Sequence, residues 1–331
     1  MIDFSEQGLS QFLDKIDEVN FEEAALDLFC FQYDNNALYK RFADALGRNK
    51  DRVGSIRSIP FLPVSFFKTY QVVSGKLSAY PLVFESSGTT GDTPSRHYIK
   101  SEKIYEQALL NGFHEFYGDP ADYAIIALLP SYLERGNASL VHMAKVLMEK
   151  SGHPANGFYL NEFEKLSEIL QQLEQAQQPV LLLGVTFALL DFATEYPQQL
   201  KNTIVMETGG MKGRREEWTR AQVHDFLKEQ LGVASVHSEY GMTELLSQAY
   251  AKDNGIFTCS NTMKVLVRDV NDPLEVKETG NGLINIIDLA NIFSCAFIAT
   301  DDIGNISPDN TFEVLGRADN AVLRGCNLMV L

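Results

Sequence analysis

The chain has 331 residues, of which 45% are hydrophobic and 22% charged, the composition of a globular protein long enough to bury a large core. Its formal net charge of -16 argues against the broad basic surface that nucleic-acid binding requires. We see no secretory signal, no apolar run long enough to span a membrane and no paired cysteine spacing. We therefore expect a cytoplasmic protein with no nucleic-acid partner and no membrane span.

The first fifty residues predict helices, because Leu9, Leu13 and Ile16 repeat at helical spacing and Ala24 and Leu28 do so again. From Pro81 onward, short apolar runs alternate with amphipathic stretches, which is typical of parallel strands joined by helices. The predicted strands are 82–84, 123–129, 180–183, 204–206 and 233–236, and the predicted helices are 102–116, 138–150, 161–175, 186–195, 215–231 and 243–250.

After about residue 250 the pattern predicts short strands separated by Gly, Asn, Asp and Pro, at 262–268, 282–288, 296–299, 312–315 and 321–324. The expected fold class is α/β, with parallel-rich sheets flanked by helices and a β-rich C-terminal subdomain. No proline-rich linker divides the chain. We therefore expect one domain, 1–331, made of a helical lead (1–80), an α/β part (81–250) and a β-rich subdomain (251–331).

A loop rich in glycines and hydroxyls follows the first strand of the α/β part and contains Ser86, Ser87, Gly88, Thr89, Thr90 and Gly91. The glycines permit tight turns, and the hydroxyl and N–H groups can surround phosphate oxygens. No Gly-Lys-Ser/Thr sequence closes the loop, so it is not a Walker A motif. Taken alone, this composition is more often that of a solvated turn.

A second segment, Ser-Glu-Tyr-Gly-Met-Thr-Glu at 238–244, lies between a predicted strand and a predicted helix, where parallel sheets bind ligands. Tyr240, Thr243 and Glu244 offer a ring, a hydroxyl and a carboxylate for a base, a phosphate and a metal ion. A capped helix start with a packed tyrosine explains the segment equally well. The later segments 299–304 and 315–320 read as turns by themselves.

Together, in type, order and approximate spacing, the four segments resemble the motifs of the adenylate-forming superfamily, which includes acyl-CoA synthetases, peptide-synthetase adenylation domains and firefly luciferase. Asp301 stands where the family usually has Gly, and the Lys that usually closes the first loop is absent. Within the superfamily the chain most resembles acyl-protein synthetases of the LuxE type, through its short length, helical lead, Ile59–Pro63 segment and the near-terminal Cys326. This resemblance implies an adenylate-forming N-terminal-type domain, with the C-terminal lid domain missing.

The resemblance also implies roles for individual residues. The loop at 86–91 would hold the phosphates of ATP, Tyr240 would pack on the adenine, and Glu244 would help to hold Mg²⁺. The implied cofactor-binding residues are Ser86, Ser87, Gly88, Thr89, Thr90, Gly91, Gly209, Gly210, Tyr240, Gly241, Asp302 and Arg317, with Asp302 and Arg317 at the ribose. The implied catalytic residues are Thr89, Thr243, Glu244 and Cys326.

The implied reaction is ATP-dependent activation of a carboxylic acid, expected to be a fatty acid, followed by acyl transfer to a cysteine thiol. Cys326 is the candidate acceptor, since Arg324 can lower the pKa of its thiol, but a small packed residue fits the sequence as well. An acyl reductase or an acyl-carrier protein is the expected partner. Two alternatives remain open: an acyl-CoA ligase, and a non-catalytic acyl- or nucleotide-binding subunit of a fatty-acid reductase-type complex.

Four further residues are expected to be packing residues more than site residues. His97 and His237 are single histidines beside the predicted motifs, and such residues are usually satisfied within a core. Cys30 lies on an apolar helix face, and Cys295 lies in the apolar run Phe-Ser-Cys-Ala-Phe.

Overall fold

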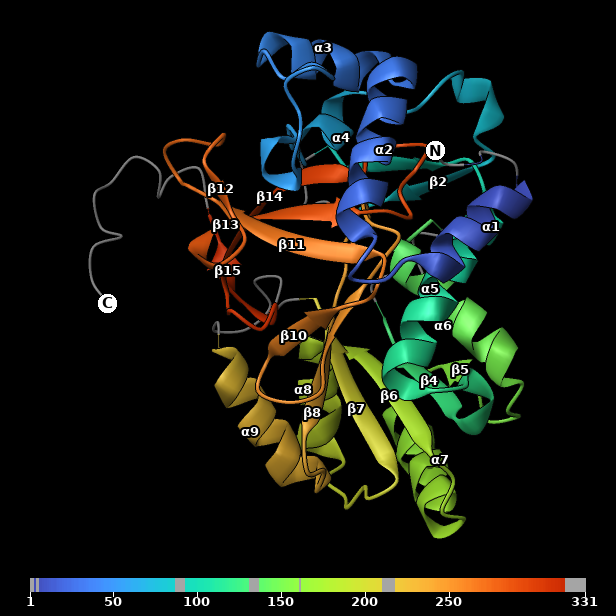
Figure 1. The fold of residues 1–331 in the computed structure, drawn as a ribbon. Coiled ribbons are helices and arrows are strands. Elements are labelled where there is room, and N and C mark those ends of the chain that lie inside the picture. The colour runs from blue at the N-terminus through green and yellow to red at the C-terminus, as the bar shows by residue number, and fades with distance from the viewer. Residues whose placement is uncertain are drawn as a thin grey trace. The chain divides into compact units, whose positions relative to one another are not determined.

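The computed structural model describes residues 3, 6–86, 93–130, 137–160, 162–209 and 218–318 (Figure 1). The contacts divide the chain into two compact units. Unit 1 contains residues 1–83, 95–104 and 261–331, and unit 2 contains residues 84–94 and 105–260. The helical lead and the C-terminal strands, which lie at opposite ends of the sequence, therefore belong to the same unit.

Unit 2 is built on a mainly parallel sheet with the strand order β10-β9-β8-β7-β6-β4-β5 (Figure 1). The strands from β5 to β8 are parallel, and β9 and β10 are antiparallel. Every residue of β4 and β6 is buried, as expected for parallel strands with both faces covered. The strands are β4 (Ala124–Leu128), β5 (Gly157–Phe158), β6 (Val180–Val185), β7 (Thr203–Thr208), β8 (Val236–Tyr240), β9 (Ala249–Ala251) and β10 (Ile256–Cys259).

The helices that join these strands confirm the alternation predicted from the sequence. They are α5 (Glu102–Tyr117), whose first three residues belong to unit 1, η3 (Pro120–Asp122), α6 (Ser139–Ser151), α7 (Phe163–Gln175), α8 (Thr186–Glu195) and α9 (Arg220–Leu231). Thr219 caps α9, with its side chain accepting from the backbone of Gln222. Helices α6 and α9 end at Gly152 and Gly232, whose φ angles of 61° and 65° suit glycine.

The helix predicted at 243–250 is wrong. Residues 241–248 form turns, and the chain then enters β9, which pairs with β8 in the register Glu239↔Tyr250 and Tyr240↔Ala249. The stretch from Leu245 to Ala251 is buried throughout, so it lacks the exposed face of an amphipathic helix. Short apolar runs do not distinguish a buried strand from a helix, which is why the pattern misled.

Unit 1 combines an antiparallel sheet, in the order β12-β11-β13-β14-β15, with the N-terminal helices. β1 adds to β14 in parallel. The strands are β1 (Leu62–Pro63), β3 (Arg96–Ile99), β11 (Met263–Arg268), β12 (Val276–Lys277), β13 (Gly280–Asp288), β14 (Phe297–Ile306) and β15 (Phe312–Arg317), and β2 (Leu82–Glu85) crosses the boundary of the units. The helices are α1 (Glu6–Lys15), α2 (Phe21–Asn35), α3 (Ala37–Ala45), η1 (Ile56–Ser58), α4 (Phe66–Thr69) and η2 (Leu77–Ala79).

A buried amide on α2 ties the helical lead to the C-terminal part of unit 1. Gln32 is fully buried, and its Nε2 donates to the carbonyls of Asn291 and Ile292, both at 2.9 Å. Its Oε1 accepts from the N–H of Ala296 at 3.0 Å. One side chain thus satisfies three buried backbone groups that no strand partner reaches.

The predicted strand at 321–324 lies outside the described residues. Within the described part of the chain, we find no helix that combines the length and the apolar character needed to cross a membrane.

Candidate active site

The carboxyl ends of β6, β7 and β8 lie at one edge of the unit 2 sheet, with Val185 paired to Thr208 and Thr208 paired to Glu239. Five predicted site residues lie at or directly after these ends: Gly209, Tyr240, Gly241, Thr243 and Glu244. Ligands of open α/β sheets bind at such an edge. The structure therefore places the unit 2 candidates where a ligand site is expected.

Tyr240 and Gly209 offer exposed surfaces at this edge. The Tyr240 ring is half-buried and packs edge-on against Phe257, with the ring centroids 5.8 Å apart. Gly209 is exposed and has a φ of 72°, a left-handed conformation that favours glycine. A partly open ring beside an accessible peptide backbone can accommodate a planar base.

Thr243 and Glu244 lie in the turn between β8 and β9. Thr243 is half-buried, and Glu244 is buried with 5% of its surface exposed. Because no helix begins here, any contact to phosphate or metal would come from the hydroxyl and the carboxylate themselves, without a helix N-terminus.

A buried carboxylate that the sequence analysis missed joins three strand ends to α9. Glu207 lies 2.8 Å from the hydroxyls of both Thr186 and Ser238, and its Oε1 is 3.4 Å from Arg220 Nε and 3.7 Å from His224 Nε2. Burial acts to raise its pKa, but these hydrogen bonds and the Arg220 charge outweigh burial, so the pKa of Glu207 is lowered. In the sequence, Glu207 appears as a single acidic residue near the end of an apolar strand.

Glu239 is a second missed carboxyl, on the opposite face of the same sheet. Its Oε2 accepts from Thr208 Oγ1 at 2.5 Å, and burial raises its pKa to about 7, helped by the negative charge of Glu207. A Cβ at Gly241 would lie 2.3 Å from Glu239 Oε1, so this position admits only glycine while Glu239 keeps its place. Between pH 5 and 7 the two carboxyl groups therefore differ in charge state, with Glu207 ionised and Glu239 mainly neutral.

His237 shares the face of Glu239. It is half-buried, and its Nδ1 lies 3.1 Å from the hydroxyl of Tyr117. Burial, together with the charge of Lys252, lowers its pKa to about 4, so the imidazole is neutral at physiological pH. Its contacts are with protein side chains, in keeping with the packing role expected.

In unit 1, Asp302 on β14 and Arg317 on β15 stand directly opposite each other, with Arg317 Nε 3.5 Å from Asp302 Oδ1. The Asp302 side chain is 12% exposed and that of Arg317 is 68% exposed. An ion pair this open to solvent adds little to stability. The structure thus brings these two predicted residues together within unit 1.

Several predicted residues lie outside the described part of the chain: Ser87, Gly88, Thr89, Thr90, Gly91, Gly210 and Cys326. Ser86 is described; it follows β2 and is half-buried. The residue before it is held by a hydrogen bond from Glu85 N to the carbonyl of Asn137, 3.0 Å long.

Two of the expected packing residues are confirmed and one is wrong. His97 is fully buried, with Nε2 3.0 Å from Asn291 Oδ1, and Cys295 is fully buried. Cys30 is exposed, because α2 buries Phe29 and Gln32 on its inner face and turns Cys30 outward.

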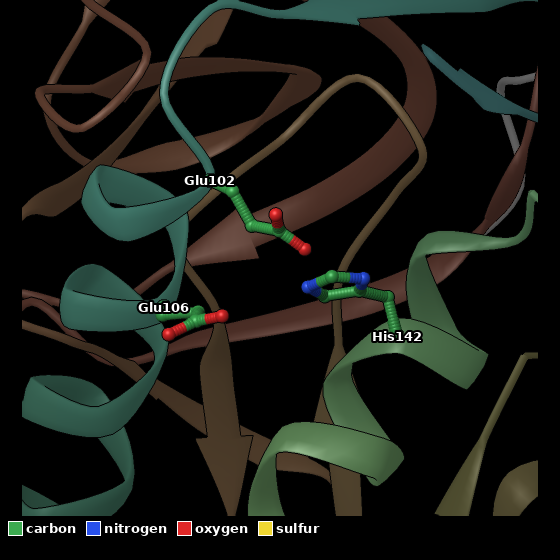
Figure 2. Close-up of side chains that lie close together, drawn as sticks. All are labelled: Glu102, Glu106 and His142. Atoms are coloured by element: carbon green, nitrogen blue, oxygen red, sulfur yellow. The ribbon is translucent and has the colours of Figure 1, made fainter. Parts of the chain in front are cut away.

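Oxygen and nitrogen donors suited to a divalent cation also gather away from the predicted motifs. Figure 2 shows Glu102 and Glu106 projecting from α5, one turn apart, and His142 from α6. Their ligand atoms lie within 4.8 Å of one another, and the His142 ring packs against Phe84 and Tyr105. Glu102 is exposed, and exposed acidic groups are common on protein surfaces without a metal.

The fold is that of adenylate-forming enzymes. ATP-bound MatB from Rhodopseudomonas palustris superposes with a TM-score of 0.53 at 15% identity, over 75% of this chain and 50% of that one. A long-chain-fatty-acid-CoA ligase from Archaeoglobus fulgidus gives a TM-score of 0.51 at 17% identity, over 72% and 52%. The chain thus spans about half the length of these enzymes. The predicted fold class, with a parallel-rich sheet and a β-rich C-terminal region, is confirmed.

In sequence, the chain is similar to the long-chain-fatty-acid–luciferin-component ligase of Aliivibrio fischeri. The two are 22% identical over 354 residues, which cover 96% of this chain and 91% of the ligase. No family model matches the chain. The resemblance predicted from the motifs, to LuxE-type proteins within the adenylate-forming superfamily, is thereby confirmed.

Proposed function

We propose that this protein is an ATP-dependent ligase that activates a carboxylic acid, expected to be a long-chain fatty acid, as an acyl-adenylate and passes the acyl group to a cysteine thiol. The observation that carries the proposal is the similarity along 96% of the chain to a ligase named for long-chain fatty acids. The adenylate-forming fold supports it, as do the candidates gathered at the carboxyl edge of unit 2.

The reaction joins two anions. A carboxylate oxygen attacks the α-phosphorus of ATP, a new P–O bond forms, and pyrophosphate leaves with the electrons of the broken P–O bond. The protein must hold the reactants in line and offset their negative charge. Mg²⁺, when bound, would neutralise part of the phosphate charge. The buried Glu244 fits this ion, since its carboxylate is a hard oxygen ligand.

The remaining roles follow the resemblance. In unit 2, Tyr240 packs on the adenine, the backbone at Gly209 lies along it, Thr243 contacts the α-phosphate, and the loop at 86–91 holds the other phosphates. In unit 1, Asp302 accepts hydrogen bonds from a ribose, and Arg317 binds ribose or phosphate. The exposed guanidinium of Arg317 suits this role, because little stability depends on its present contact.

Cys326 is proposed as the acyl acceptor, with the thiolate attacking the acyl carbon and AMP leaving. A reductase or an acyl-carrier protein would then take the acyl group. A cytoplasmic location, where ATP is available and thiols stay reduced, is part of this proposal.

The test is acid-dependent exchange of labelled pyrophosphate into ATP, over a panel of fatty and aromatic acids. We expect exchange with long-chain acids, its loss in Glu244→Gln, and its retention in Glu229→Gln, which alters an exposed glutamate on α9. Exchange that survives Cys326→Ser while acyl labelling of the protein is lost would support the acceptor role.

Other outcomes favour other functions. Turnover that requires coenzyme A and survives Cys326→Ser would point to an acyl-CoA ligase. Ligand binding without exchange for any acid would point to a non-catalytic subunit.

A further inference from the structure

Unit 1 contains a cavity of about 240 Å³ between the helical lead and the C-terminal sheet. Its walls come from α3, η1, the segment around β1, the turn before β12, and strands β11 and β14. None of the predicted site residues lines it. The lining instead contains two features that the proposed function leaves unexplained. One is Ile59, Phe61 and Pro63 of the 59–63 segment, and the other is Asp301, which stands where adenylate-forming enzymes usually have glycine.

The wall is mostly apolar, with Phe42, Leu46, Ile59 and Phe61 among its side chains. The charged groups on it are three guanidinium groups and one carboxylate, that of Asp301. An apolar chamber with a net positive lining is complementary to a molecule that has an apolar body and an anionic head.

Arg268 supplies the most informative of these charges. It is 9% exposed, and its guanidinium donates to the carbonyls of Ile284 and Thr300 and to Asn285 Oδ1, at 2.9, 2.6 and 2.8 Å. All three acceptors are neutral, and the carboxylate whose charge acts on this guanidinium is that of Asp301, on the same wall. Asp301 offsets one of the three guanidinium charges on this wall, so a net positive charge remains that an anionic ligand would neutralise.

Two more guanidinium groups border the cavity. Arg57 is exposed, and its nearest acid is Glu278 at 4.0 Å, which also lies 3.1 Å from Lys264 Nζ. Arg48 is half-buried and forms no ion pair within the described ranges. Guanidinium groups bind carboxylates through paired hydrogen bonds, so both can receive an anionic head.

We propose that this cavity binds a carboxylate with a short apolar body, such as a medium-chain fatty-acid anion. The carboxylate contacts the arginines, and the apolar body packs against Phe42, Ile59 and Phe61. The volume lies below the roughly 300–1,000 Å³ of drug-sized ligand pockets, which favours a body shorter than a long-chain acid. This site is separate in its residues from the proposed adenylation machinery and does not depend on it.

The test is calorimetric titration of the full chain with octanoate, without ATP, compared with octan-1-ol and inorganic phosphate. We expect octanoate to bind more tightly than either. The double variant Arg48→Gln/Arg57→Gln should weaken octanoate at least about tenfold, since two charge-assisted hydrogen-bonding groups are lost. Val276→Trp, which fills the cavity, should abolish the same binding. The matched control Arg52→Gln changes an exposed arginine outside the lining and should bind as the wild type.

Octanoate can also enter the proposed adenylation site, so pyrophosphate exchange with a long-chain acid is measured on the same preparations. The cavity variants should leave exchange unchanged. An octanoate affinity that is the same in the wild type and in both cavity variants would overturn this proposal. Binding of octan-1-ol or of phosphate as tight as that of octanoate would also overturn it. Cavity-dependent binding without any exchange would support this proposal while refuting the proposed function.

Discussion

Replacing Glu239 with glutamine should make unit 2 more stable at alkaline pH. Burial raises the pKa of this carboxyl from 4.5 to about 7. The unfolded chain therefore releases the proton at lower pH than the folded protein, and stability is lost as pH rises from 4.5 through 7. At about 1.4 kcal/mol per pH unit, the penalty is about 1 kcal/mol at pH 5 and about 3 kcal/mol at pH 8. Glutamine has the same shape and no charge, and its oxygen can still accept from Thr208.

The assay is urea unfolding of wild type and Glu239→Gln at pH 5 and pH 8. The stability gained by the variant should be larger at pH 8 by about 2 kcal/mol. The control Glu229→Gln, at an exposed glutamate, should show no such pH-dependent difference. A variant that is equally affected at both pH values, or less stable than wild type at pH 8, would refute the reasoning that Glu239 is held mainly uncharged.

Three further outcomes are expected. Gln32→Leu should lower the unfolding free energy by about 2–4 kcal/mol in urea titrations, because it leaves three buried backbone groups without a hydrogen-bond partner. The control Gln7→Leu, at an exposed position, should leave the unfolding free energy unchanged. Gly241→Ala should reduce pyrophosphate exchange at least about tenfold by displacing Glu239, and Glu239→Ala in the same chain should restore stability lost to the clash. By NMR the imidazole of His237 should titrate near pH 4, below its ordinary 6.5, so that its contribution to stability is lost as pH falls through this range; a midpoint above 6 would contradict its burial.

The helices and strands that could be predicted are those whose own residue pattern is enough to determine their conformation. The buried strands β4 and β6 and the amphipathic helix α7 carry periodic patterns that need no knowledge of their neighbours. The helix prediction for the segment from Leu245 to Ala251 was wrong because pairing with β8, and not the segment's own residue pattern, determines its conformation. The prediction for Cys30 failed because the buried residues of α2 form one stripe at helical spacing and Cys30 lies off it, on the opposite side. The buried residues are Phe21, Ala24, Ala25, Leu28, Phe29, Gln32 and Tyr33.

The same distinction explains what was found and missed at the candidate site. Tyr240, Thr243 and Glu244 were found because they form one contiguous motif. Glu207 was missed because its partners Thr186 and Ser238 are 21 and 31 residues away and meet it only once the parallel sheet has formed.

The two missed carboxyl groups bear directly on how an acidic protein can accept ATP and a carboxylate. Glu207 is ionised, but Arg220 and hydrogen bonds from Thr186 and Ser238 surround its charge. Glu239 lies on the other face and is kept largely uncharged below pH 7 by burial. Below pH 7, neither therefore adds an unpaired negative charge at the carboxyl edge, where it would repel anions. Glu244 is left as the carboxylate that we propose for a metal ion at this edge.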